Sequence, residues 1–266
     1  MPRDFARIES PSSINTYKQC PRKYYYQYIL SLPTVASIHL VRGKAVHEAL
    51  EQFFKLDIKQ VNLTNWEEEL RIILLDLFDK SWQSKQEELE SFMLGEQMLE
   101  YYRRESVFMI ENFWRGFVKK IKDLGKPVAI AFVELQPRTE VYYKSAKHGV
   151  QGFVDAIHRI ADQVILMDYK TSKSAEISDS YRLQLAIYCL LYYERHGDLP
   201  GKVGINFLKF GEQLLDVDSE LLALAKKEVE FIHSVNRSKD IKDYPKAESP
   251  LCKWGSGQCD FFDVCK

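Results

Sequence analysis

The sequence predicts an α/β (α+β) fold in which a mixed β-sheet forms the core and helices flank it. Three observations predict this fold. Short segments rich in β-branched and aromatic residues, such as 150–160 and 164–170, are typical of strands. A longer segment, 179–196, carries an apolar stripe at helical spacing. Another apolar segment, KVGINFLKF, follows that helix and predicts a further strand of the same sheet.

The N-terminal part of the chain is predicted to be helical. Pro11, Ser12 and Ser13 form an N-cap pattern before a first helix at about 12–29. After a loop, the segment RGKAVHEALEQFF (residues 42–54) predicts a second helix. Two helices therefore precede the first strand.

The middle of the chain is predicted to form a helical subdomain that lies over the cleft or shapes the path of the strands. Residues 66–123 are mostly helical in pattern, and Gly125-Lys126-Pro127 ends this region. The strands expected next are 128–135, 138–144, 150–160 and 164–170. After the helix near 179–196 and the break GDLPG, we expect the strands KVGINFLKF and QLLDV and then a helix near 217–237.

These elements suggest four parts of the chain. Residues 1–57 contribute N-terminal helices, 58–126 form the helical insertion, 127–240 form the core, and 241–266 form a cysteine-rich end. With 266 residues, of which 45% are hydrophobic, the chain can bury a sizeable core.

The hairpin at residues 151–171 carries two carboxylates and an ammonium, on Asp155, Asp168 and Lys170. Side chains alternate across a strand, so Asp168 and Lys170 share a face. A two-residue turn at 161–162 or 162–163 places Asp155 opposite Asp168 or one pair away, with the carboxylates roughly 5–8 Å apart. One hard cation could bridge them, and the Tyr169 carbonyl could supply another oxygen. The alternative is a surface hairpin with an ordinary cross-strand ion pair.

The arrangement resembles the PD-(D/E)XK nuclease superfamily, and specifically its RecB-like branch. Asp155 stands for the first acid of the motif, and Asp168-Tyr169-Lys170 stands for the (D/E)-x-K element. Upstream, His47 in RGKAVHEALEQFF is similar to the metal-binding histidine of that branch. The resemblance runs from Ser10 to Cys265, except for the middle at 58–126. Many members have Glu where this chain has Asp168.

A second helix matches the branch as well. Gln184 and Tyr188 in YRLQLAIYCLLYY are similar to its Q-x-x-x-Y helix. The resemblance implies a restriction-endonuclease-like core with catalytic residues Asp155, Asp168, Lys170, Gln184 and Tyr188. It also implies metal ligands His47, Asp155, Asp168 and Tyr169 for Mg²⁺ or Mn²⁺. Lys170 would then position or activate a water, or stabilise charge on the phosphate.

Each supporting residue also has a structural interpretation. His47 lies in a helix with an apolar stripe, and Gln184 and Tyr188 lie one turn apart and could merely flank a core stripe. Glu134, in the expected strand 128–135, could add a carboxylate or could sit at a sheet edge. Glu51 lies one turn after His47 and could orient its imidazole.

Four cysteines lie near the two ends of the chain: Cys20, Cys252, Cys259 and Cys265. Their pattern resembles the [4Fe–4S] staple of the iron–sulfur nucleases, which include AddB-type helicase–nucleases and CRISPR-adaptation exonucleases. Zinc and inert thiols are the alternatives. Disulfides are not expected, because the sequence predicts no signal peptide and an intracellular location is expected. The fifth, Cys189, lies in an apolar helix and is expected in the core.

The composition argues against nonspecific DNA binding over the whole surface, because the formal net charge is −1. A local track remains possible where Lys18, Arg22 and Lys23 are interleaved with tyrosines at positions 17, 24, 25, 26 and 28. The alternative is a helix whose tyrosines pack inward. No apolar run could cross a membrane, so a cytoplasmic (intracellular) location is expected.

We expect a metal-dependent deoxyribonuclease, and single-stranded DNA exonuclease activity in DNA repair, recombination or CRISPR adaptation. The expected partners are DNA with free ends and a helicase or CRISPR-adaptation protein on another chain. Two other classes stay open: a catalytically silent DNA-binding subunit of a helicase–nuclease complex, and a zinc-stapled nucleic-acid-binding module.

Overall fold

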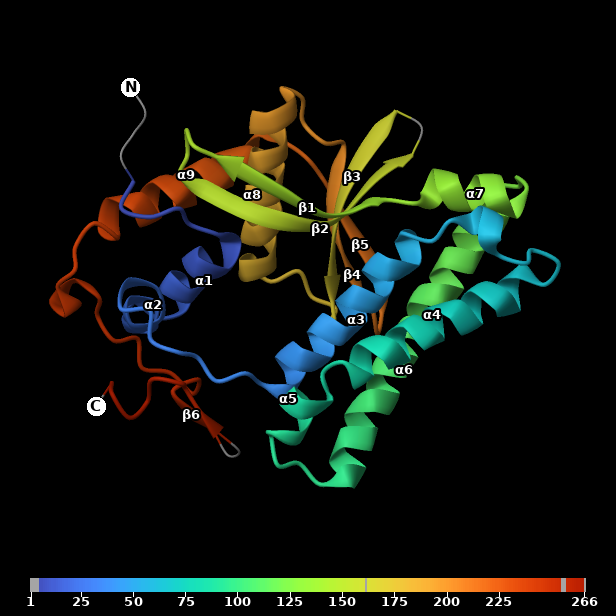
Figure 1. Cartoon of the computed structure of the whole chain (residues 1–266). Coiled ribbons are helices and arrows are strands. Elements are labelled where there is room, and N and C mark those ends of the chain that lie inside the picture. The colour runs from blue at the N-terminus through green and yellow to red at the C-terminus, as the bar shows by residue number, and fades with distance from the viewer. Residues whose placement is uncertain (1–4, 161, 255–256, 266) are drawn as a thin grey trace.

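A five-stranded mixed sheet forms the core of the computed structural model, which describes residues 5–160, 162–254 and 257–265. Its strands follow the order β1-β2-β3-β4-β5 (Figure 1). They are β1 (Arg138–Ser145), β2 (Val150–Ile160), β3 (Gln163–Lys170), β4 (Lys202–Phe207) and β5 (Gly211–Asp216). A mixed sheet flanked by helices is the predicted architecture, and this prediction is confirmed.

One strand pair in the sheet is parallel. Strand β3 pairs with β4 in parallel, whereas the other neighbours are antiparallel. A parallel pair needs a crossover connection, and helix α8 (Asp179–His196) supplies it. The helix predicted near 179–196 is therefore confirmed, and it leads the chain from the end of β3 back to the start of β4.

The β2–β3 hairpin has one of the two predicted registers. Ile160 pairs with Gln163, so residues 161 and 162 connect the strands, and position 161 lies outside the described residues. The same register pairs Ala156 with Met167. The next residue on each strand, Asp155 on β2 and Asp168 on β3, therefore lies opposite the other.

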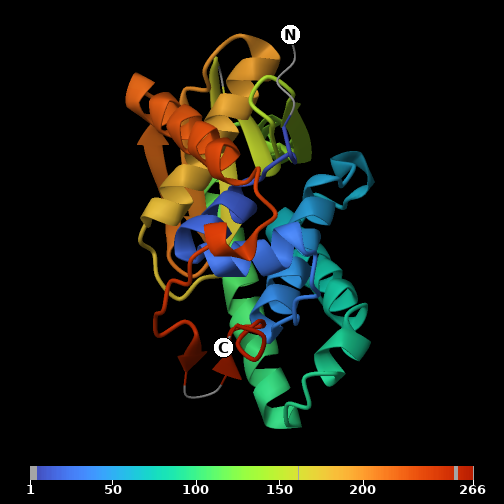
Figure 2. The same cartoon turned by 90° about the vertical axis from the view of Figure 1, so that its left-hand side faces the viewer.

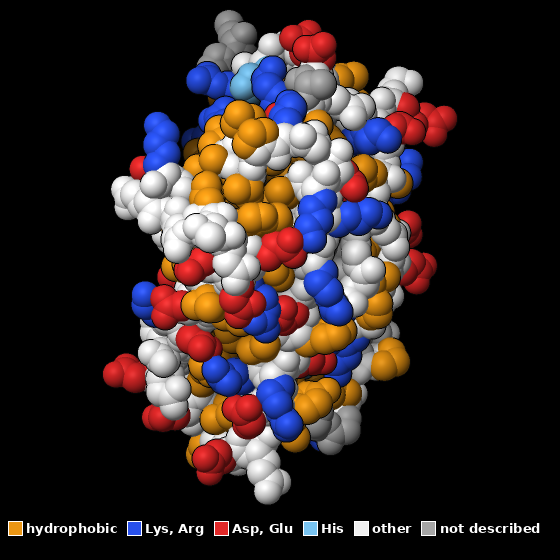
Figure 3. Space-filling model, turned by 90° about the vertical axis from the view of Figure 1, so that its right-hand side faces the viewer, with side chains coloured by type: hydrophobic (Ala, Val, Ile, Leu, Met, Phe, Trp, Pro, Cys, Tyr) orange, Lys and Arg blue, Asp and Glu red, His pale blue; other side chains and the backbone are white. Residues whose placement is uncertain are grey.

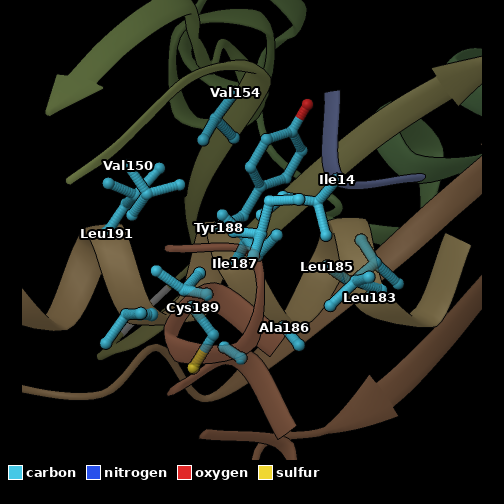
Figure 4. Close-up of a cluster of buried hydrophobic side chains, with 14 of the residues drawn as sticks. Ile14, Val150, Val154, Leu183, Leu185, Ala186, Ile187, Tyr188, Cys189 and Leu191 are labelled. Atoms are coloured by element: carbon cyan, nitrogen blue, oxygen red, sulfur yellow. The ribbon is translucent and has the colours of Figure 1, made fainter. Parts of the chain in front are cut away.

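Each face of the sheet is covered by helices with a hydrophobic core of their own (Figure 1). Helices α8 and α9 (Ser219–Val235) cover one face, and Figure 4 shows the α8 side chains packed in this core. Helices α3 (Ile38–Phe54), α4 (Trp66–Gln83) and α6 (Glu96–Asp123) cover the other face, with short α5 (Gln86–Glu90) beside them. The helical region predicted at 66–123 is confirmed.

The N-terminal helix is broken, unlike the predicted continuous helix at 12–29. Helix α1 (Pro11–Gln19) ends before the extended residue Cys20, α2 (Pro21–Tyr24) follows, and a π-helix spans Tyr25–Ile29. Pro21 explains the break, because proline disfavours a helical conformation in the residue before it and cannot donate to the preceding turn. The C-terminal segment lies beside these helices (Figures 1 and 2), and Tyr26 donates a hydrogen bond to the Val264 carbonyl.

The expected strand at 128–135 is wrong, because this segment is helix α7 (Val128–Leu135). Its sequence VAIAFVEL is a short apolar run, for which periodicity does not separate a strand from a buried helix. Ala131, Phe132 and Leu135 are buried at helical spacing, whereas Ile130 and Val133 are exposed. The helix thus packs only one stripe into the core.

The remaining elements are short. They are the 3₁₀ turns Ile58–Gln60 and Ile241–Asp243 and the small hairpin of β6 (Lys253–Trp254) and β7 (Gly257–Gln258). On the face shown in Figure 3, acidic and basic side chains are intermixed around an apolar area. In the part of the chain that the structure describes, no helix combines the length and apolarity needed to span a membrane.

Candidate active site

The predicted catalytic residues gather where β2 and β3 separate. The described ladder between these strands ends at the Ala156–Met167 pair. Beyond it, the carboxylate of Asp155 accepts a hydrogen bond from the backbone N–H of Tyr169, at 2.8 Å. Asp155 thereby fills the gap between the diverging strands and is fixed beside Asp168.

Asp168 is held by two side chains of helix α8. Its side chain is buried, and Gln184 donates from Nε2 to Asp168 Oδ1 at 2.7 Å. The Tyr188 hydroxyl accepts from Gln184 at 2.7 Å and lies 3.5 Å from the same carboxylate oxygen. The Ser178 side chain caps the start of α8 and so sets the helix position. Figure 4 shows the Tyr188 ring among buried side chains, with its hydroxyl pointing out of the cluster.

Lys170 lies beside the other oxygen of Asp168. Its Nζ is 2.7 Å from Asp168 Oδ2 and 5.3 Å from the centre of the Tyr181 ring. Burial acts to lower the pKa of Lys170, but the charge and hydrogen bond of Asp168 outweigh burial and raise it. The side chain is therefore an ammonium at neutral pH.

Helix α3 brings His47 to the same place. Its Nδ1 lies 3.4 Å from Asp155 Oδ2. Burial lowers the pKa of His47, although the nearby Asp168 charge acts in the opposite direction. A neutral imidazole offers a ring nitrogen to a metal, so the structure places His47 in the protonation state that a ligand requires.

Glu140 on β1 joins this group and was missed by the sequence analysis. One ligand atom each from His47, Glu140 and Asp155 lie within 4.8 Å of one another. Glu140 falls between the Thr139–Ala156 and Val141–Val154 pairs, opposite Asp155. Its φ of 49° is unusual for a residue other than glycine. Pairing the predicted strands 138–144 and 150–160 as a hairpin would have opposed Glu140 to Asp155.

The residues present fit a divalent cation. Ligands on opposite sides of Mg²⁺ lie about 4.2 Å apart, because each bond is about 2.1 Å long. The ligand atoms of His47, Glu140 and Asp155 all lie within 4.8 Å of one another, a limit only slightly above this distance. Asp168 Oδ2 is also suited to a metal, because it is buried beside the Lys170 ammonium and no backbone or amide group of the described residues donates to it.

The carboxylates are crowded without a cation. Burial raises the pKa of Asp155, and the charge of Asp168 raises it further. Burial also raises the pKa of Glu140, and the charges of Glu51 and Asp168 add to this effect. Buried like charges cost free energy unless they are protonated or neutralised, so the cluster is electrostatically prepared for a positive ion.

Comparison with known proteins agrees with this geometry. The family model described as the PD-(D/E)XK nuclease superfamily matches residues 9–266. The chain belongs to the PD-(D/E)XK nuclease superfamily. A crystal structure from Eubacterium rectale, described as a "Putative exonuclease", has a similar fold. The TM-score is 0.52 at 11% sequence identity, and the match covers 97% of this chain and 92% of that chain. No curated protein matches the sequence.

Of the two further carboxylates considered with the PD-(D/E)XK site, Glu134 lies away from it, whereas Glu51 lines the same cleft as His47. Glu134 lies on α7 rather than on a strand, and its partner is Lys126, at 2.5 Å. Glu51 pairs with Lys55 at 2.5 Å, so its carboxylate is engaged by its own helix. Glu140, rather than Glu134, provides the additional carboxylate beside Asp155.

Four of the five tyrosines in the segment 17–28 pack inward, which favours the second of the two alternatives considered for this segment. The tyrosines at positions 17, 24, 25 and 26 are buried, because they pack on one another and on the core. Lys18 pairs with Glu228 at 2.7 Å, and Arg22 donates to the Tyr244 carbonyl. This segment therefore joins the N- and C-terminal parts of the nuclease rather than presenting rings to a substrate.

The four terminal cysteines line one cavity of about 190 Å³: Cys20, Cys252, Cys259 and Cys265. Cys189 is separate and buried in α8, as predicted. Among the residues that the structure describes, no three cysteine sulfurs lie within 4.8 Å of one another. The cysteines are thus gathered around one space, but their sulfurs are not drawn together as a metal-binding group.

Proposed function

We propose that this protein is a metal-dependent DNA nuclease that hydrolyses phosphodiester bonds, with single-stranded DNA as the substrate of its exonuclease activity. One observation carries the proposal. The hairpin acids, Lys170 and His47 meet at a single point, beside an open cleft of about 620 Å³ that His47, Glu140 and Asp155 line. An ordinary surface hairpin would not bury Asp168 or bring a histidine from a distant helix to Asp155.

In this proposal, some side chains bind the metal and Lys170 acts on the phosphate. His47, Asp155 and Asp168, with the Tyr169 carbonyl and Glu140, would hold Mg²⁺ or Mn²⁺. The cation would neutralise phosphate charge and lower the pKa of water. The Lys170 ammonium is placed to stabilise the charge that develops on the phosphate.

Gln184 and Tyr188 act on the reaction through Asp168. Their contacts fix the carboxylate in one orientation against α8. A carboxylate held in place before the substrate arrives costs less to organise during the reaction. We therefore assign Gln184 and Tyr188 a positioning role through Asp168.

The RecB-like assignment and the pathway are part of this proposal. The helix that carries His47 and the helix that carries Gln184 and Tyr188 both face the acids, as that branch would require. Members of the branch work largely on strands with free ends, in repair, recombination or CRISPR adaptation. A helicase or CRISPR-adaptation protein would then be the partner that supplies such a strand.

The cysteine cavity would hold a [4Fe–4S] cluster. Four thiolates are the usual ligands of such a cluster, and all four terminal cysteines face one cavity. Sulfurs around zinc lie roughly 3.8 Å apart, because each bond is about 2.3 Å. Among the described residues no three cysteine sulfurs lie within 4.8 Å of one another, so the thiols are not gathered as zinc would require. The cluster would fasten the C-terminal segment to Cys20.

The test is anaerobic cleavage of end-labelled DNA with Mn²⁺, comparing wild type with Lys170→Ala. Linear single-stranded, linear double-stranded and circular single-stranded DNA are offered in parallel. The proposal expects wild type alone to degrade the linear single strand, while the circle survives. Cleavage of the circular strand would demonstrate endonuclease activity and would contradict the exonuclease part of the proposal. Binding of DNA by both proteins without cleavage would instead support a silent structural subunit.

A further inference from the structure

Two exposed aromatic rings stand side by side on β1 and β2. Tyr142 and Phe153 are cross-strand partners, with ring centroids 5.0 Å apart. Their exposed fractions are 48% and 54%, and the two rings adjoin rather than being scattered singly. Such exposure is a cost that a binding surface would explain.

The two rings point away from helix α8. Their strand neighbours face that helix: Tyr143 packs on Tyr192, and Gly152 lies against Tyr188. Because side chains alternate along a strand, Tyr142 and Phe153 occupy the opposite face. This is the face toward which helix α3 brings His47.

The rings adjoin the acids along the same two strands. Tyr142 lies two residues beyond Glu140, and Phe153 lies two residues before Asp155. Two residues of strand span about 6.8 Å. The open face of the hairpin therefore carries the carboxylates first and the aromatic pair directly after them.

Polar groups follow the rings on the same face. Lys144 pairs with Gln151 two residues further along the hairpin, and the Tyr142 hydroxyl donates to Gln151 at 2.9 Å. Lys144 is exposed and forms no ion pair with any residue that the structure describes. The order along the strands is thus acids, aromatic rings, then a cation and an amide.

We propose that Tyr142 and Phe153 form a stacking platform for an unpaired base of the DNA strand whose phosphate lies at the acids. Lys144 then contacts a neighbouring phosphate. This inference rests on the proposed nuclease function and adds to it the residues that select unpaired DNA. A base in a duplex is stacked on both sides and cannot lie flat on these rings, whereas a single-stranded base can.

The same rings could merely stabilise the hairpin, since cross-strand aromatic pairs contribute to sheet stability. The experiment therefore removes the base as well as the rings. Wild type and the double variant Tyr142→Ala/Phe153→Ala are assayed with Mn²⁺ on a labelled single strand. A set of otherwise identical strands carries one abasic nucleotide, moved position by position. Phe231→Ala, which truncates an exposed aromatic ring on α9, is the matched control.

The inference expects the double variant to lose about tenfold or more in kcat/KM on the intact strand. It also expects one abasic position at which wild type falls by a similar factor and the double variant falls no further. Tyr142→Phe, which keeps the ring, and Phe231→Ala should retain wild-type rates. Melting temperatures of all variants check that they fold.

Two outcomes overturn the platform while leaving the nuclease proposal intact. One is equal cleavage of the intact strand by wild type and the folded double variant. The other is an equal loss for both proteins at every abasic position. If wild type cleaves no DNA, the proposed function fails, and fluorescence anisotropy tests the platform separately. Equal affinity of wild type and the double variant for the intact strand would then reject it.

Discussion

The carboxylate of Asp155 accepts a hydrogen bond from the backbone N–H of Tyr169, at 2.8 Å. Tyr169 separates Asp168 from Lys170 along β3, so this one bond ties the first acid of the site to the other two groups. It forms where the β2–β3 ladder has ended, and it satisfies a backbone donor that the sheet no longer pairs. The site therefore lies where two strands diverge, and a backbone N–H fixes the position of Asp155 relative to Asp168 and Lys170.

Glu140→Gln should weaken metal use. In this group of three candidate ligands, the substitution removes a negative charge and leaves a weaker, neutral amide oxygen in place of the carboxylate. We expect the Mn²⁺ concentration at half-maximal activity to rise by about tenfold or more. Glu134→Gln is the matched control, because Glu134 pairs with Lys126 on the surface. Identical Mn²⁺ titrations for Glu140→Gln and the control would remove Glu140 from the metal site.

Gln184→Ala should slow cleavage more than Tyr188→Phe does. Gln184 makes the shorter contact with Asp168, at 2.7 Å, whereas the Tyr188 hydroxyl lies 3.5 Å away. We expect a loss in kcat of about tenfold for Gln184→Ala and a smaller loss for Tyr188→Phe, with little change in KM for either. Single-turnover rates at saturating DNA measure the difference. The reverse order of effects would show that Tyr188 has a role beyond holding Asp168.

Acid should destabilise the protein partly through His158. Burial, with a further contribution from Lys120, lowers the pKa of His158 from 6.5 to about 4. The unfolded chain therefore binds more protons than the folded chain between these values, so stability falls as pH falls from 6.5 toward 4. The loss from this group is at most about 3 kcal/mol.

Urea denaturation of wild type and His158→Gln at pH 7 and pH 5 checks this expectation. Wild type should lose more unfolding free energy between the two pH values than His158→Gln loses. Acids common to both proteins, including those of the site, cancel in the comparison. Equal losses would mean that His158 is freely protonated in the folded state.

Replacement of any terminal cysteine should remove iron and lower the melting temperature. Cys20→Ser tests the N-terminal side of the cavity and Cys259→Ser tests the C-terminal side. Iron content and thermal unfolding are measured on protein purified without oxygen. Cys189→Ala is the control that should keep its iron, because this thiol is buried in α8 apart from the cavity. Stoichiometric zinc without iron in wild type would reject the iron–sulfur assignment.

The hairpin of the site was predictable from sequence because its information is local. Strand residues flank a short polar break, and the strand period relates Asp155 to Asp168 once the turn length is chosen. The helix that carries Gln184 was equally clear, since its apolar residues recur at helical spacing. These elements follow from patterns within about twenty residues.

Glu140 and α7 depended on information that is not local. The φ of Glu140 is positive, although the residue lies within a strand. Its carboxylate is a candidate metal ligand only because His47 lies nearby, and His47 is on a helix more than ninety residues earlier in the chain. For α7, the apolar run was compatible with strand or helix, and packing of Phe132 against Phe53 and Phe117 selected the helix. The sequence likewise did not distinguish surface from core positions for the tyrosines near Cys20, because their burial depends on contacts with the distant C-terminal part of the chain.

The most direct test of the central claim is the Mn²⁺ dependence of single-stranded DNA cleavage by wild type and Asp168→Ala, with Asp216→Ala as the control. Asp216 is an exposed strand aspartate paired with Lys202, away from the site. The account predicts metal-dependent cleavage by wild type and Asp216→Ala, and a loss of at least about a hundredfold for a folded Asp168→Ala. Cleavage by Asp168→Ala at a rate near that of wild type would contradict it.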